Sequence, residues 1–99
     1  SNFYGRAKGG VNGLTQQLAT ELGGQNIRVN AIAPGPIDTE ANRSSTPQEI
    51  VEDIVKRLPL SRMGEPDALV GMCLFLLSDQ AKWITGQIFN VDGGQIIRS

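Results

Sequence analysis

The hydrophobic positions of residues 4–22 recur at the spacing of a helix. Successive apolar side chains are separated by four, three, four and four residues: Ala7, Val11, Leu14, Leu18 and Leu22. This period places them on one face of a helix, and the Gly23-Gly24 pair that follows is a typical helix end. We therefore predict a helix over 4–22.

The same helix carries a second, unusual face. Gly5, Gly9 and Gly13 follow one another four residues apart, so they form a stripe without side chains. Each glycine costs a helix up to about 1 kcal/mol relative to alanine. The stripe allows two interpretations, a tolerated weak helix or a surface for the close approach of another helix, such as one from a second subunit.

Residues 27–33 are apolar at most positions, a pattern typical of a strand covered on both faces in a parallel sheet. We expect Pro34-Gly35-Pro36 to end this strand abruptly, because proline cannot donate a ladder hydrogen bond. Residues 36–46 then have the composition of a loop.

A second helix is expected to begin at Thr46-Pro47. Thr46 can cap the helix, Pro47 suits the first helical position, and Glu49 can complete a capping box. The apolar face is formed by Ile50, Val51, Ile54, Val55 and Leu58.

A third helix is expected from Glu65-Pro66 to Leu77. It is apolar almost all round after Asp67, so we predict that it is largely buried, Cys73 included. Residues 87–92 read as a last strand before Gly93-Gly94.

The predicted order is helix, strand, helix, helix, strand, which indicates an α/β architecture with parallel pairing. Two strands make a poor sheet, since a stable sheet usually needs three or more. We therefore expect the chain to be incomplete as a stand-alone domain.

Composition narrows the function. The 99 residues are 39% hydrophobic and 19% charged, with 9 basic and 10 acidic side chains and no basic run, so neither nucleic-acid nor membrane binding is indicated. No apolar stretch is long enough to span a bilayer, and no secretory signal opens the chain. The single cysteine, Cys73, permits no internal disulfide and fits a reducing, cytoplasmic compartment. Histidine is absent, which excludes a histidine base and makes a metal site unexpected.

Tyr4 and Lys8 are the candidate catalytic pair. They lie four residues apart at the start of the first helix, so both side chains project from one edge. An ammonium about 4 Å from a phenol contributes roughly 4 kcal/mol at an effective dielectric near 20, which would lower the pKa of the phenol by about three. Such a tyrosine could exchange a proton with an alcohol or carbonyl oxygen.

Several motifs surround this pair in a fixed order. They are Tyr4-Gly5-Arg6-Ala7-Lys8, the run from Ile27 to Thr39, Arg62-Met63-Gly64-Glu65-Pro66, Phe75-Leu76-Leu77-Ser78, Ile84-Thr85-Gly86-Gln87 and Asn90-Val91-Asp92-Gly93-Gly94. In this order the chain resembles the C-terminal portion of a short-chain dehydrogenase/reductase. The resemblance implies the C-terminal part of a Rossmann-like, doubly wound parallel sheet.

The resemblance also implies roles for single residues. Tyr4 matches the catalytic acid/base, and Lys8 matches the lysine that lowers its pKa and hydrogen-bonds the nicotinamide ribose. Pro34 and Gly35 match the turn beside the nicotinamide ring. Ile37 matches the position whose backbone holds the carboxamide, and Thr39 the hydroxyl that reaches the carboxamide or the phosphates. The implied cofactor is NAD or NADP, and the implied substrate is a small alcohol or carbonyl compound.

By the same resemblance the chain divides into four segments. Residues 1–24 match the catalytic helix, 25–39 the strand and nicotinamide-end loop, 40–63 the substrate loop region, and 64–99 the C-terminal helix and strand. Family members are commonly dimers or tetramers, so a homo-oligomer is expected.

One departure from the family pattern limits what this chain can do. The glycine-rich turn that cradles the dinucleotide must follow a strand and open a helix, whereas the glycines at 9–13 lie inside a helix. The family's catalytic serine would precede residue 1. We therefore expect an oxidoreductase in the parent protein and inactivity in the isolated chain. The alternative is a non-catalytic interaction or oligomerisation module that lacks a dinucleotide-binding half.

Overall fold

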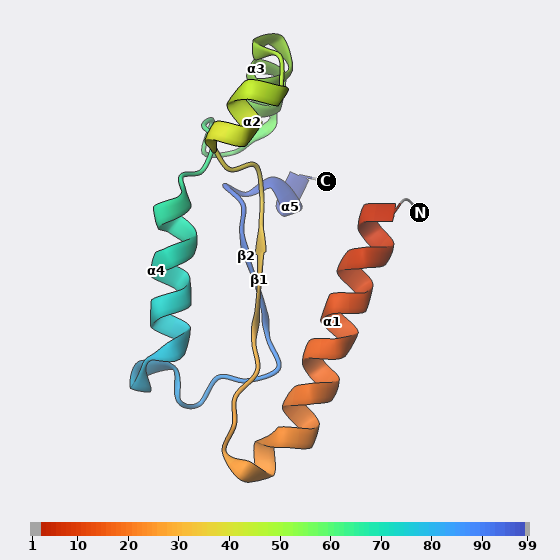
Figure 1. Cartoon of the computed structure of the whole chain (residues 1–99), viewed down its shortest axis with the longest axis vertical. Coiled ribbons are helices and arrows are strands. Elements are labelled where there is room, and N and C mark those ends of the chain that lie inside the picture. Colours follow the sequence, from red (N-terminus) through yellow and green to blue (C-terminus); the bar gives the residue numbers. More distant parts are fainter. Residues whose placement is uncertain (1–2, 99) are drawn as a thin grey trace. The chain divides into compact units, whose positions relative to one another are not determined.

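The structure is a computed structural model that describes the backbone of residues 3–98 and the side chains of residues 9–96. Figure 1 shows the elements along the chain. In order, they are α1 (Phe3–Leu22), the 3-10 turn η1 (Gly23–Gln25), β1 (Ala31–Pro34), α2 (Glu40–Ser45), α3 (Gln48–Arg57), α4 (Pro66–Leu77), the 3-10 turn η2 (Asp79–Ala81), β2 (Ile88–Val91) and α5 (Gln95–Arg98).

The predicted first helix is confirmed as α1, which ends at Leu22 as expected. The chain then tightens into η1, and Asn26 adopts the left-handed conformation with φ of 61°. Its backbone N–H donates to the carbonyl of Gly23 at 2.9 Å. The glycine pair therefore marks the end of the helix, but asparagine supplies the left-handed residue that closes it.

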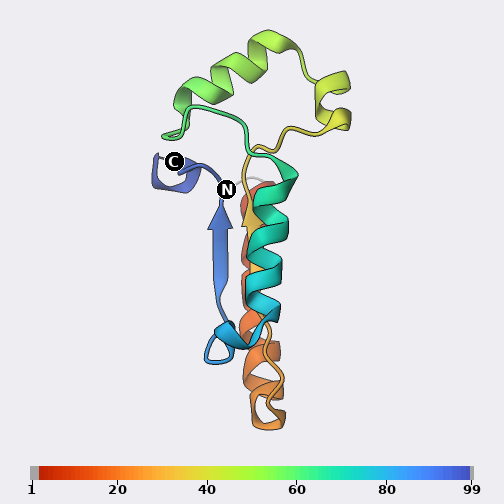
Figure 2. The same ribbon diagram turned by 90° about the vertical axis from the view of Figure 1, so that its left-hand side faces the viewer.

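The two strands pair in parallel, which confirms the predicted α/β pattern. Ala31 N–H donates to Gln87 carbonyl at 2.9 Å, and Gly35 N–H donates to Val91 carbonyl at 3.1 Å. Both partners advance by four residues, as a parallel ladder requires. Figure 2 shows the two arrows pointing the same way.

The first predicted strand begins later than its apolar pattern suggested, because residues 27–30 do not join the ladder. They are tied instead to the segment that leads into β2. Val29 N–H donates to the Thr85 hydroxyl at 3.0 Å, and Val29 carbonyl accepts from Gly86 N–H at 2.8 Å. Pro34 belongs to the strand itself, because Ala31 and Gly35 supply the N–H donors toward β2 and position 34 supplies neither of them.

The prediction of a loop over 36–46 is wrong, because α2 occupies Glu40–Ser45. Thr39 caps this helix: its hydroxyl accepts from the N–H of Asn42 at 3.1 Å, and Glu40 places an acidic side chain in the first turn. A helix of six residues is too short to show apolar periodicity.

The expected cap of α3 is also wrong. The helix begins at Gln48, the residue before it is Pro47, and no side chain caps it. Thr46 instead closes the preceding helix, since its N–H donates to Asn42 carbonyl at 2.9 Å. Only two residues separate α2 from α3, and Thr46 is the C-terminal cap of α2 rather than the N-terminal cap of α3.

The extent of α4 is confirmed, but its predicted burial is wrong. Within the described part of the chain only Leu76 is buried in this helix. Leu74 is 63% exposed, Leu77 is 75% exposed, and Cys73 is exposed as well. An all-round apolar helix needs neighbours on every side, and the described residues cover only a small part of it.

Packing divides the chain into two compact units. The first unit contains Ser1–Ile32 and Leu74–Phe89, and the second contains Ala33–Cys73 and Asn90–Ser99. Among the described residues of the first unit, the buried ones are mostly small: Thr15, Ala19, Leu76 and Ala81. In the second unit Leu58 is buried, at 2% exposure.

Candidate functional site

Helix α1 carries the candidate catalytic pair in the first unit. Its helical backbone runs through Tyr4 and Lys8, which places the two residues one turn apart. Their side chains lie outside the described residues, so the predicted contact between phenol and ammonium stays a prediction.

The candidate nicotinamide-end loop, Pro34 to Thr39, lies in the second unit. It is held by a parallel bridge between Ile37 and Gly64. Gly64 N–H donates to Pro36 carbonyl at 2.9 Å, and Asp38 N–H donates to Gly64 carbonyl at 2.7 Å. The loop is therefore fixed by main-chain bonds to a segment distant in sequence.

The bonds of this bridge use the Pro36 carbonyl and the Asp38 N–H, so the N–H and carbonyl of Ile37 itself face away from Gly64. Ile37 carbonyl accepts from the side-chain amide of Asn42 at 2.8 Å. Its N–H donates to no acceptor among the described residues. Ile37 is half-buried, and a backbone N–H without such a partner at a fixed place in a loop suits an acceptor oxygen of a bound molecule.

Thr39 offers a second donor on the same loop. Its oxygen accepts from Asn42 N–H at 3.1 Å, which uses an acceptor position and leaves the hydroxyl proton to donate. Ile37 and Thr39 thus present donors of the kind that a carboxamide or phosphate oxygen requires, so the residues present fit the nicotinamide end of a dinucleotide.

Gly35 has a reason of its own within the protein. A Cβ atom at this position would lie 2.6 Å from the Cβ of Asp92. Real Cβ atoms do not approach so closely, so the turn admits only glycine. Glycine is required at position 35 because the Asp92 segment of the same chain lies so close, and this requirement would exist without any ligand.

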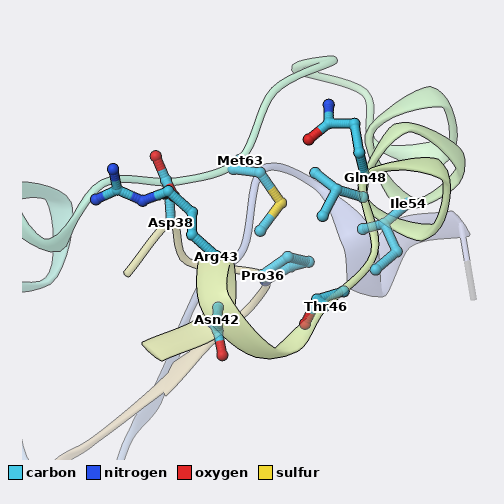
Figure 3. Close-up of a pocket in the computed structure, with 9 residues that line it drawn as sticks. Pro36, Asp38, Asn42, Arg43, Thr46, Gln48, Ile54 and Met63 are labelled. Atoms are coloured by element: carbon cyan, nitrogen blue, oxygen red, sulfur yellow. Dashed lines mark ion pairs between the residues drawn. The ribbon is translucent and has the colours of Figure 1, made fainter. Parts of the chain in front are cut away.

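Beside this loop lies a pocket of about 420 Å³, within the size range of small-molecule sites. Figure 3 shows its residues, with Met63 and Pro36 facing the α3 residues Gln48 and Ile54. The apolar lining consists of Pro36, Val51, Ile54 and Met63, and the polar lining of Asp38, Asn42, Arg43, Thr46 and Gln48. The pocket lies entirely in the second unit.

The two charges on the pocket wall neutralise one another. Arg43 Nε lies 3.0 Å from a carboxylate oxygen of Asp38. Both side chains are substantially exposed, so the pair adds little to stability. Its effect is to leave the wall without net charge.

The structure therefore groups the predicted site residues in two sets. Tyr4 and Lys8 share one helix of the first unit, while Pro34, Gly35, Ile37 and Thr39 share one loop of the second. Sequence reasoning missed Asn42, whose bonds to Ile37 and Thr39 organise that loop. The hydroxyl of Thr39 before an acidic Glu40 is the signal that could have revealed the helix carrying it.

The described residues contain neither a candidate metal-binding cluster nor a candidate membrane-spanning helix. No group of three histidine, cysteine, aspartate or glutamate side chains is placed to hold a metal ion. Among the described helices, none has the length and apolar character needed to cross a membrane.

Comparison with known proteins supplies the context. The family model of enoyl-(acyl carrier protein) reductase matches residues 1–95. An uncharacterized oxidoreductase of Mycobacterium tuberculosis is 78% identical over 99 residues, which are all of this chain and 40% of that protein. The chain thus spans about 40% of the length of this curated relative.

Two solved structures align with most of the chain. One is 4-hydroxyisoleucine dehydrogenase complexed with NADH, with a TM-score of 0.84 and 39% identity, over 95% of this chain and 39% of that one. The other is an Agrobacterium tumefaciens protein with bound NADP, with a TM-score of 0.87 and 41% identity, over 96% of this chain and 39% of that one. The architecture is therefore part of a Rossmann-like parallel sheet. A short-chain type dehydrogenase/reductase from Mycobacterium ulcerans also aligns, with a TM-score of 0.88 and 45% identity, over 96% of this chain and 35% of that one. Since the family model covers nearly the whole chain, the chain belongs to the short-chain dehydrogenase/reductase family.

Proposed function

We propose that the protein containing this chain transfers a hydride between NAD(H) or NADP(H) and a small alcohol or carbonyl compound. The observation that carries the proposal is the continuous helix through Tyr4 and Lys8 in a chain of this family. The NADH and NADP bound by its structural neighbours support a nicotinamide cofactor.

In this proposal Tyr4 is the acid/base. Its phenol donates a proton to the carbonyl oxygen during reduction and accepts it from the alcohol during oxidation. Lys8 lowers the pKa of that phenol and hydrogen-bonds the nicotinamide ribose. The cofactor, when bound, supplies the hydride chemistry.

The loop of the second unit would hold the nicotinamide end. The Ile37 N–H, which has no acceptor among the described residues, and the Thr39 hydroxyl would donate to the carboxamide or phosphate oxygens. Pro34 and Gly35 would form the turn beside the ring. The four segments would then be the catalytic helix (1–24), the strand and nicotinamide-end loop (25–39), the substrate loop region (40–63) and the C-terminal helix and strand (64–99).

The pocket suggests what kind of substrate part binds there. Its apolar lining, Val51, Ile54 and Met63 included, would contact a hydrocarbon body. Because the Asp38–Arg43 pair leaves no net charge, the pocket favours an uncharged group over a carboxylate or phosphate.

The decisive test uses the full-length protein. Tyr4→Phe removes only the hydroxyl, so turnover of a carbonyl probe such as phenanthrenequinone should fall by about 10²–10⁴. NADH or NADPH binding, followed by nicotinamide fluorescence, should stay close to that of the unmodified protein. Undiminished turnover in this variant would refute the role of Tyr4.

A second candidate function is self-association, which is compatible with the first. A Cβ atom at Gly9 or Gly13 would meet nothing within 4 Å among the described residues, so this stretch of α1 is open to a close neighbour. A homo-oligomer would use such a surface. In sedimentation experiments Gly13→Leu should weaken association of the full-length protein, and an unchanged mass would remove this candidate.

A further inference from the structure

Asn42 connects the candidate cofactor loop with the candidate substrate pocket. Its side-chain amide donates to Ile37 carbonyl at 2.8 Å, and its N–H donates to the Thr39 hydroxyl at 3.1 Å. Its own carbonyl accepts from Thr46 N–H at 2.9 Å. Asn42 and Thr46 both line the pocket. One residue thus bonds the Ile37 carbonyl and the Thr39 hydroxyl oxygen of the candidate cofactor loop, and also a pocket residue, Thr46.

The bond to Ile37 completes the fixing of two consecutive peptide groups. Gly64 N–H holds Pro36 carbonyl, which directs Ile37 N–H the opposite way, since the two groups of a trans peptide are antiparallel. The next peptide is held at its N–H by Gly64 and at its carbonyl by Asn42. Without the Asn42 amide, the second peptide would keep only its bond to Gly64, and the backbone of Ile37 between the two peptides would be less constrained.

The bond to Thr39 sets the direction of the second donor. Because Asn42 N–H occupies one lone pair of the Thr39 oxygen, the hydroxyl proton must point elsewhere. This N–H lies in the first turn of α2, so a displacement of the helix would move the hydroxyl as well.

We infer that Asn42 is a positioning residue that couples the substrate pocket to nicotinamide binding through Ile37 and Thr39. The inference rests on the proposed function, because it takes these two residues as cofactor contacts. Asn42 itself touches no reacting atom. It acts by holding two donors in the geometry that the cofactor needs.

The test compares three variants of the full-length protein. Asn42→Ala removes the side-chain amide, and Asn42→Asp keeps its shape while replacing the donor by a carboxylate that repels the Ile37 carbonyl. Ser44→Ala is the matched control on the same helix, since the Ser44 hydroxyl bonds only Ala41 carbonyl within α2. For each variant the Kd of NADH and NADPH is measured by fluorescence, together with the thermal unfolding midpoint.

Both Asn42 variants should raise the Kd of the preferred dinucleotide by about two- to tenfold, the size of one net hydrogen bond. Ser44→Ala should leave it unchanged. A merely structural role would lower the midpoint or the fraction of folded protein without changing the Kd of the folded fraction.

The outcomes distinguish failure of the inference about Asn42 from failure of the proposed oxidoreductase function. If the unmodified protein binds dinucleotide and both folded Asn42 variants match Ser44→Ala, the inference is overturned while the proposed function stands. If the unmodified protein binds neither dinucleotide, the proposed function fails and the inference fails with it. Should Asn42→Ala not fold, Asn42→Asp carries the test alone.

Discussion

Gly35 and Asp92 approach so closely that no side chain fits between them. A Cβ atom on residue 35 would lie 2.7 Å from the Cα of Asp92, as well as being too close to its Cβ. Asp92 cannot easily move away, because its carboxylate accepts from Gly94 N–H at 2.9 Å and from Ile96 N–H at 3.1 Å. The candidate cofactor loop is thereby packed against the turn that follows β2.

Gly35→Ala should therefore destabilise the full-length protein by about 1–3 kcal/mol. The physical reason is overpacking against main-chain atoms, which can relieve the contact only if the turn shifts. The measurement is the free energy of unfolding from urea denaturation, and dinucleotide affinity should fall as the loop moves.

Gly10→Ala provides the control of opposite sign. A Cβ atom at Gly10 meets nothing within 4 Å among the described residues, and alanine is favoured over glycine in a helix by up to about 1 kcal/mol. Equal losses of stability in the two variants would contradict the packing argument.

Asn30 joins the approach to β1 with the approach to β2. Its amide donates to Ile84 carbonyl at 3.1 Å, and its side-chain oxygen accepts from Gln87 N–H at 3.1 Å. Asn30→Ala loses both bonds and should cost about 1–3 kcal/mol in unfolding free energy. Asn30→Asp keeps the acceptor for Gln87 N–H but places a carboxylate oxygen against the Ile84 carbonyl, so at neutral pH it should be no more stable than Asn30→Ala. If the aspartate variant were as stable as the unmodified protein, the bond to Ile84 would contribute nothing to stability.

The sequence predicted best the elements whose apolar positions repeat. Helix α1 and helix α4 are periodic or uniformly apolar over many residues, and their ends agree with the structure. Helix α2 has no room for such a repeat, and its cap depends on one hydroxyl at Thr39. The burial of α4 could not be predicted locally, because burial is set by the neighbours that surround a helix.

The site was predicted in the same uneven way. The spacing of Tyr4 and Lys8 suggested a candidate pair, and the family resemblance supplied their roles and the candidate loop from Pro34 to Thr39. The position of Asn42 emerged only once the chain was folded, because its partners meet it through a cap and a loop. The closeness of Gly35 to Asp92 likewise depends on two segments far apart in sequence.

Lys8→Met tests the role of the lysine in the proposed catalytic pair. The variant keeps a long side chain in the helix but removes the ammonium, so carbonyl reduction by the full-length protein should fall by about 10²–10⁴. The Kd of the dinucleotide should also rise, since the resemblance assigns Lys8 a ribose contact. Lys56→Met is the control, because Lys56 lies on the exposed face of α3. A Lys8→Met enzyme with full turnover would show that the phenol needs no neighbouring cation.

The 99-residue chain by itself should neither bind dinucleotide saturably nor catalyse reduction. It includes no glycine-rich turn between a strand and a helix, which is the part that holds a pyrophosphate. Its buried apolar residues among those described are few: Ala19, Leu58, Leu76 and Ala81. Large apolar side chains such as Leu74 and Leu77 stay in solvent, and Trp83 is 97% exposed. Such a chain should bind an apolar fluorescent dye and unfold over a broad temperature range.

Titration of the 99-residue chain with NADH and NADPH checks the expected lack of dinucleotide binding, with the full-length protein under the same conditions as the control. Saturable binding accompanied by turnover in the short chain would overturn this expectation and place the cofactor site within these residues.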